Sequence, residues 1–192
     1  MSPIKRNPLP KCGRRLLADF LRARRGLAAV EFALILPFMM VMYLGTFEIV
    51  QALSVKRQVT LAASTLANII TQYPSLTRAS DWPTIYTAAG TVLTPYSTAN
   101  AGVTVSVVTI NSPGKATVTW SLPGYNGTAR VKGSPLTVPT TLGSANTELV
   151  LGEVTYKYQP IIDFLHIGTI NMYSSVYMLP RGTTGQILCP DC

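Results

Sequence analysis

The chain contains little of the chemistry that enzymes use. Its 192 residues include a single histidine, His166, and only eight acidic residues. It has no glycine-rich phosphate loop, no His-Glu-x-x-His motif and no Gly-x-Ser-x-Gly motif. Asp163 and His166 form a local i, i+3 pair, which is more often structural than catalytic. We therefore predict a protein that is not an enzyme, with no catalytic residue, cofactor, metal ion or small-molecule substrate.

Charge is also scarce beyond the first 25 residues. That first segment holds eight basic residues against one acid, Asp19, whereas residues 26–192 hold eight basic residues against seven acids. A nucleic-acid interface needs a clustered basic footprint on the folded part of the chain, so we predict no nucleic-acid partner. A basic flank beside an apolar run is instead typical of the cytoplasmic side of a membrane helix.

A long apolar run follows the basic segment. Sixteen uncharged residues separate Glu31 from Glu48, and the run extends from Leu27 to Leu53. A helix needs roughly 20 apolar residues to span a bilayer. A cleavable secretory signal has a shorter apolar core and a small-residue cleavage site, and no such site follows Leu53. We predict a retained, single-pass transmembrane helix over residues 27–53, with a cytoplasmic N-terminus.

Gly26, Leu27, Glu31 and Phe32 form a motif where this run begins. A carboxylate near the end of a membrane helix is costly and suggests a function. The simple interpretation is that Glu31 lies at headgroup depth and is solvated. The alternative is a cut after Gly26, which would let the new α-amino group of Leu27 pair with Glu31 of the same or a neighbouring subunit. Such a pair is favourable in a low dielectric only when both partners are present.

Gly-x-x-x-x-Glu-Phe after a basic leader resembles the processing signature of type IV pilin-like proteins. Residues 25–37 are more narrowly similar to the TadE/TadG-like proteins, which are minor pilins (pseudopilins) of the tight-adherence, or Flp-type, pilus system. Residues 156–160 and 177–181 are also similar to the way such proteins end. The soluble portion is far larger than that of the short major pilin, which favours a minor subunit.

The resemblance implies a set of partners and a location. A prepilin peptidase would cut between Gly26 and Leu27, and other pilins and pilus assembly proteins would contact the mature helix. The protein would lie in the inner membrane with a periplasmic C-terminal domain, and would assemble or prime a pilus used in surface adhesion. The alternative is an uncleaved single-span inner-membrane anchor that carries a periplasmic adaptor or ligand-binding domain.

The rest of the chain predicts an α+β fold, pilin-like, in which a long N-terminal helix packs on a small antiparallel sheet of about four strands. Apolar residues with helical spacing continue the helix to Tyr73 and predict a core-facing stripe, with subunit packing as the other possibility: Val55, Val59, Ala62, Leu66, Ile69 and Tyr73. The expected elements are a short helix over 82–93, a hairpin over 103–122, weak strands at 129–132 and 136–138, a strand over 149–159, a short helical or irregular segment over 161–167 and a strand over 170–179.

These features divide the chain into a cytoplasmic leader (1–26), a transmembrane helix (27–53), its soluble continuation (54–73) and a periplasmic α+β domain (74–192). The chain ends Cys189-Pro190-Asp191-Cys192. A zinc site needs four ligands, and a redox motif needs a thioredoxin-like surrounding that the sequence lacks. In an oxidising compartment we predict a disulfide between Cys189 and Cys192, worth on the order of 2 kcal/mol.

Overall fold

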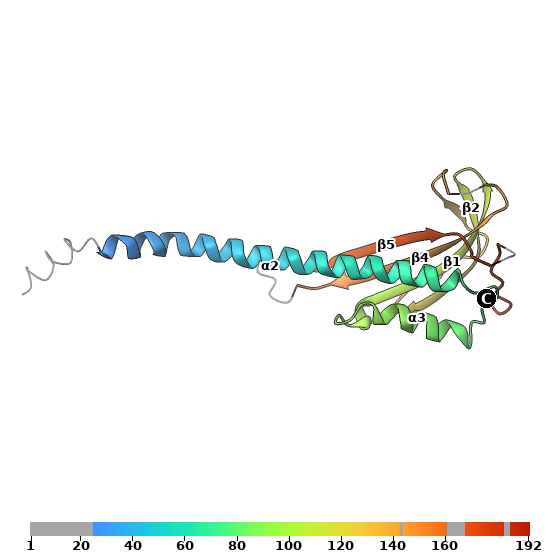
Figure 1. Ribbon diagram of the computed structural model, residues 1–192, viewed down its shortest axis with the longest axis horizontal. Helices are drawn as coiled ribbons and strands as arrows, with labels where there is room; N and C mark the ends of the chain where they lie inside the picture. The colour runs from blue at the N-terminus through green and yellow to red at the C-terminus, as the bar shows by residue number, and fades with distance from the viewer. Residues whose placement is uncertain (1–24, 143, 161–167, 183–184) are drawn as a thin grey trace, which may run out of the picture. The chain divides into compact units, whose positions relative to one another are not determined.

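The computed structural model describes residues 25–142, 144–160, 168–182 and 185–192 (Figure 1). The chain divides into two compact units, Met1–Phe47 and Glu48–Cys192. Helix α2 runs over Arg25–Ile70 with Pro37 inside it, which confirms the long N-terminal helix. The prediction for 161–167 lies outside the described residues.

Helix α2 ends three residues before the predicted end at Tyr73. Thr71 N still bonds Ala67 O at 3.0 Å, but Gln72 and Tyr73 donate to Ile69 and Ile70 over the shorter i−3 spacing. A tightened last turn of this kind is common at helix ends. Pro74 then prevents the chain from continuing as an α-helix, because the residue before a proline is driven out of that conformation.

The unit Glu48–Cys192 contains a five-stranded antiparallel sheet with the order β3-β2-β1-β4-β5. Its strands are β1 (Ala101–Ser112), β2 (Lys115–Tyr125), β3 (Pro135–Thr137), β4 (Glu148–Tyr158) and β5 (Ile170–Met178). The predicted hairpin, the strand near 136–138 and the two C-terminal strands are thereby confirmed. Gly114, at a φ of +79°, supplies the left-handed residue of the β1–β2 turn.

The strand predicted over residues 129–132 is wrong. This segment is irregular and is held to the sheet by side-chain hydrogen bonds: Thr104 Oγ1 donates to Thr128 O at 3.2 Å, and Arg130 N donates to Ser121 Oγ at 3.0 Å. Val131 is 75% exposed. Without an apolar face to bury, the segment gains nothing from continuing the sheet.

Helix α3 (Asp81–Thr91) and the single 3₁₀ turn η1 (Thr98–Asn100) connect α2 to the sheet. The short helix predicted over residues 82–93 is therefore confirmed. Gly90 lies inside this helix and lets Tyr125 pack closely against it: a Cβ at Gly90 would lie 2.2 Å from the hydroxyl oxygen of Tyr125. The loss of helix propensity at a glycine is the cost of that close contact.

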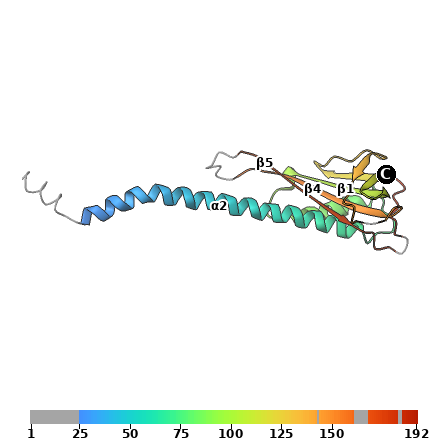
Figure 2. The ribbon, with the colours of Figure 1, turned by 90° about the horizontal axis from the view of Figure 1, so that it is seen from above.

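The core lies between the second half of α2 and one face of the sheet. The residues of the predicted stripe from Val55 to Leu66 are completely buried, and Ile69 and Tyr73 pack against them. From the sheet, β1 and β4 contribute buried valines to the same cluster: Val103, Val105, Val107, Val150 and Val154. This confirms the core-face interpretation of the stripe. Figures 1 and 2 show this part of α2 running beside the sheet.

A glycine allows the helix to approach the sheet closely. A Cβ at Gly152 would lie 2.8 Å from the backbone oxygen of Ala63 and 3.1 Å from the Cβ of Ala67. Small residues therefore face one another on α2 and β4. This contact was not predicted, because neither the glycine nor the alanines stand out from their neighbours in the sequence.

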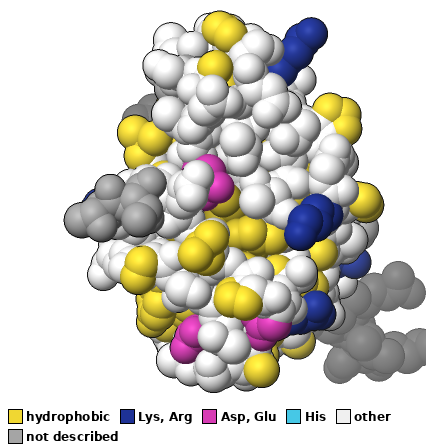
Figure 3. All heavy atoms as spheres, turned by 90° about the vertical axis from the view of Figure 1, so that its right-hand side faces the viewer, with side chains coloured by type: hydrophobic (Ala, Val, Ile, Leu, Met, Phe, Trp, Pro, Cys, Tyr) yellow, Lys and Arg dark blue, Asp and Glu magenta, His cyan; other side chains and the backbone are white. Residues whose placement is uncertain are grey.

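The opposite face of the sheet is half apolar and half polar. Near the β1–β2 turn a second, smaller core contains Val108, Ile110, Val118 and Leu149. Toward the other end of the strands, polar residues are buried instead, among them Thr104, Ser106 and Glu153. The end of the domain seen in Figure 3 carries few, scattered charged side chains of either sign, as the composition of residues 26–192 leads one to expect.

Candidate functional site

The first half of α2 presents apolar side chains to its surroundings. Val30, Leu34 and Phe38 are 59%, 69% and 77% exposed. Within the described part of the chain, one helix, Ala28–Ile70, is long and apolar enough to span a membrane. Its mean hydropathy is 1.9, and 11% of its apolar stretch is buried. A core helix of a soluble protein would be mostly buried. This N-terminal helix therefore suggests a single-pass membrane anchor.

The four residues of the N-terminal motif lie at the start of this helix. Gly26 is exposed, and a Cβ added there would meet no atom within 4 Å. Glu31 is exposed and Phe32 is 61% exposed. Leu27 is helical, while its side chain lies outside the described residues. The bond between Gly26 and Leu27 belongs to the first helical turn, where backbone N–H groups have no intrahelical partners, so this turn opens at little cost.

The two acids that bound the apolar run have different surroundings. Glu31 is exposed, whereas Glu48 is 5% exposed and belongs to the folded domain. Beyond it, the ammonium group of Lys56 donates to the backbone oxygen of Tyr173 on β5. Helix α2 is therefore tied to the sheet close to where the predicted transmembrane run ends. In the sequence, Glu48 served only as the charge that bounds the apolar run, and its burial was not predicted.

An ion pair between a buried carboxylate and a partly exposed arginine lies on the polar half of the sheet. Arg130 binds Glu153 through two hydrogen bonds of 2.7 Å, and the Tyr173 hydroxyl donates to Glu153 Oε1 at 2.6 Å. Glu153 is 8% exposed. Burial raises the pKa of Glu153, but the hydrogen bonds from Arg130 and Tyr173 outweigh it and hold that pKa below its ordinary value. Burial and the same carboxylate raise the pKa of Tyr173, so the hydroxyl keeps its proton at neutral pH.

The sequence did not predict this cluster. The strand over 149–159 was predicted with no role for Glu153, and Arg130 lies in the segment wrongly expected to be a strand. Arg130 and Glu153 are 23 residues apart, and no short-range pattern joins them. Their pairing depends on how the chain leaves β2 and crosses β4.

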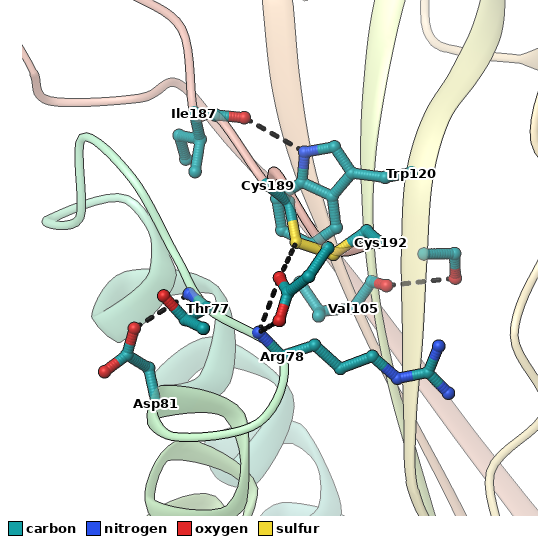
Figure 4. Close-up of a disulfide and its surroundings, with 10 residues drawn as sticks. Thr77, Arg78, Asp81, Val105, Trp120, Ile187, Cys189 and Cys192 are labelled. Carbon is teal, nitrogen blue, oxygen red and sulfur yellow. Dashed lines mark hydrogen bonds between the residues drawn. A yellow bond between two sulfur atoms is a disulfide. The ribbon is translucent and has the colours of Figure 1, made fainter.

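The C-terminal tail, residues 185–192, is bonded to the segment that follows α2. A disulfide joins Cys189 to Cys192 (Figure 4), and Asp191 between them accepts from Arg78 N with both carboxylate oxygens at 2.9 Å. Leu188 exchanges backbone hydrogen bonds with the segment after α2, at Pro74 and Leu76. The tail therefore fixes the turn between α2 and α3.

Two further bonds attach the tail to the sheet. The Trp120 indole N–H donates to Ile187 O at 2.9 Å, and Ile187 N donates to a carboxylate oxygen of Glu148 at 3.0 Å. Among the described residues, the cysteine and carboxylate ligand atoms close enough to share a metal belong to Cys189, Asp191 and Cys192. Because the two sulfurs are bonded to each other, neither offers a thiolate to a metal.

The comparison with protein families gives one match, which begins at the glycine of the motif. Residues 26–68 match a family described as TadE-like protein. The matched segment covers almost all of helix α2 and stops before the sheet begins, and it associates the chain with the Tad pilus. It confirms the resemblance to the TadE/TadG-like proteins. No curated protein and no solved structure matches the chain.

Proposed function

We propose that this protein is a minor pilin, or pseudopilin, that assembles or primes a tight-adherence pilus used in surface adhesion. The observation that carries the proposal is the TadE-like match over 26–68, which starts at Gly26 and covers a helix whose first half is apolar and exposed. A helix with exposed apolar residues on all sides needs lipid or other helices around it. A pilin exchanges the first environment for the second.

In this proposal a prepilin peptidase of the inner membrane cuts the chain between Gly26 and Leu27. The exposed position of Gly26 and the open space around it are compatible with entry into a protease site. The freed α-amino group of Leu27 then pairs with Glu31 of a neighbouring subunit as the helices bundle. The unit Glu48–Cys192 faces the periplasm and later the outside of the pilus.

N-terminal sequencing and intact mass of protein extracted from its native membrane test the cleavage. We expect a mature chain that begins at Leu27. Gly26→Ala should slow leader removal at least tenfold in a pulse–chase experiment, while Gly13→Ala, a control within the same leader, should leave it unchanged. A native protein that retains residues 1–26 would instead favour an uncleaved inner-membrane anchor with a periplasmic adaptor domain and would contradict the proposal.

A further inference from the structure

Two adjoining hollows lie on the polar side of the sheet. One has a volume of about 400 Å³ and the other about 330 Å³, and both are lined by Asn126, Thr155 and Tyr173. Small-ligand sites begin at roughly 300 Å³, so each hollow has room for a small ring. Because the hollows share three residues, a ligand of two or three linked rings could occupy both.

The hollows arise because side chains of very different size lie next to one another along one row of the sheet. Gly102 on β1 is opposite Thr155 on β4, which is opposite Tyr173 on β5. A residue without a side chain and a small residue therefore lie next to a large aromatic ring. Tyr173 is 49% exposed. Its hydroxyl is held by Glu153, which fixes the orientation of the ring at the centre of the two hollows.

The segment that borders the second hollow is held in place before any ligand arrives. Asn126 N donates to Ala101 O at 3.1 Å and its side-chain amide donates to Ala99 O. A Cβ at Gly127 would lie 2.0 Å from Val103 O, so only glycine permits this approach. Tyr125, just before it, has a φ of +50°. Strained backbone held by its surroundings is a recurrent feature of binding sites.

The ion pair of the second hollow is not what a stable sheet requires. Replacing a buried ion pair with apolar residues is often neutral or stabilising, and the other half of the same face is built from apolar residues. Arg130, with its side chain 34% exposed, is fully compensated by Glu153. The pair therefore supplies strong, fixed donors and acceptors without adding net charge.

The remaining lining has the chemistry of polyhydroxyl recognition. Amides from Asn100, Asn126 and Asn171 and hydroxyls from Thr104 and Thr155 line the two hollows, so donors and acceptors lie side by side. Lys157 is the one lining cation that the structure does not pair with an acid among the described residues. A polyanion would need several such cations. A neutral sugar needs paired donors and acceptors and an aromatic ring on which its apolar C–H face can lie.

We infer that the two hollows around Tyr173 form a binding site for a short, uncharged oligosaccharide. The sugar ring lies against the phenol ring of Tyr173, and its hydroxyl or acetamido groups bond the asparagine amides and the Arg130–Glu153 pair. The site belongs to the unit Glu48–Cys192 and does not depend on whether the leader is removed. A failure of the proposed pilin function would therefore leave the sugar site standing, and a failure of the sugar site would leave the proposed pilin function standing.

The test uses the full chain in a non-glycosidic detergent, because a maltoside headgroup would compete for the site. Saturation-transfer difference NMR is measured with N-acetylglucosamine trisaccharide, cellotriose and maltotriose, and with a sulfated heparin tetrasaccharide as the charged comparison. We expect at least one neutral trisaccharide to bind with a Kd on the order of 1 mM, unaffected by 0.3 M NaCl. No transfer to any neutral trisaccharide at 20 mM would overturn the inference, as would salt-sensitive binding of the heparin fragment alone.

Variants locate the site. Tyr173→Ala should weaken binding at least tenfold. Asn171→Ala, at an exposed position of β5 whose side chain makes no hydrogen bond to the described residues, should weaken it three- to fivefold. Asn111→Ala, an exposed asparagine near the β1–β2 turn, is the matched control and should bind as the wild type does. If Tyr173→Ala does not fold, Asn171→Ala and Tyr173→Phe remain. If Asn171→Ala binds the trisaccharide as tightly as the wild type and the Asn111→Ala control do, the sugar binds elsewhere and the proposed site is refuted.

Discussion

The two halves of helix α2 are both apolar, and the structure uses them in opposite ways. From Val30 to Leu53 large apolar side chains remain exposed, whereas from Val55 to Leu66 the residues of the apolar stripe are completely buried. The first half carries bulky residues on all sides. The second half carries its buried apolar residues on one face, and Lys56, Arg57 and Gln58 are among the residues on the other faces. Hydrophobicity alone does not decide burial; the distribution around the helix does.

The largest expected effect comes from the buried half. Leu66→Ala removes a completely buried side chain and should lower the free energy of unfolding of the domain by about 3 kcal/mol. Leu34→Ala makes the same change in the exposed half and should lower it by less than about 0.5 kcal/mol. Urea unfolding followed by tryptophan fluorescence measures both, because Trp82 and Trp120 lie in the domain. Equal effects would mean that the halves do not differ as described.

The closeness of α2 to the sheet is tested by adding a methyl group. Gly152→Ala would place its Cβ against the backbone of Ala63, where nothing flexible can move aside, and should cost about 2 kcal/mol. Gly182→Ala, where a Cβ meets nothing within 4 Å, is the control and should be neutral in the same urea experiment. A stable Gly152→Ala variant would show that the helix can move away from the sheet without loss.

The comparison extends to acids, one buried and one exposed. The pKa of Glu153 is lowered on folding. The contribution of its charged carboxylate to the free energy of unfolding is therefore complete above the pKa of the unfolded state, about 4.5. That contribution is lost as the pH falls through the lower pKa of the folded state. Glu153→Gln should cost about 1–2 kcal/mol at pH 7, and the difference from the wild type should shrink below pH 4. If the difference in unfolding free energy between Glu153→Gln and the wild type does not change with pH, the charge of Glu153 does not account for it.

The smallest effect on stability is expected at Glu31. Glu31→Ala should leave membrane insertion and the unfolding of the domain unchanged, because the side chain is exposed. It should reduce the recovery of other pilins in co-purification from native membranes, since the proposed partner of Glu31 is an α-amino group of another subunit. Undiminished recovery of other pilins with Glu31→Ala would argue against the amine–carboxylate pair.

Periodicity and turn chemistry predicted most of the fold. The stripe from Val55 to Leu66, the hairpin over 103–122 and the strand over 149–159 were predicted from local patterns, and the structure contains all three elements. The failure at residues 129–132 has a physical reason: a short segment with weak alternation takes its conformation from its partners, here Ser121 and Glu153. The approach of Ala63 to Gly152 was missed because small residues leave no periodic signal.

The sequence by itself determined the position of the apolar helix, the glycine–glutamate motif that the TadE-like match includes, and the α+β class, because these depend on composition and on spacing within a few residues. Only the tertiary structure decided which half of α2 is buried, that Arg130 meets Glu153 beneath Tyr173, and that Ile187 fastens the tail to Trp120. These contacts join residues 20 to 67 positions apart, and a pairing over such distances is set by strand order and register, which no local pattern encodes.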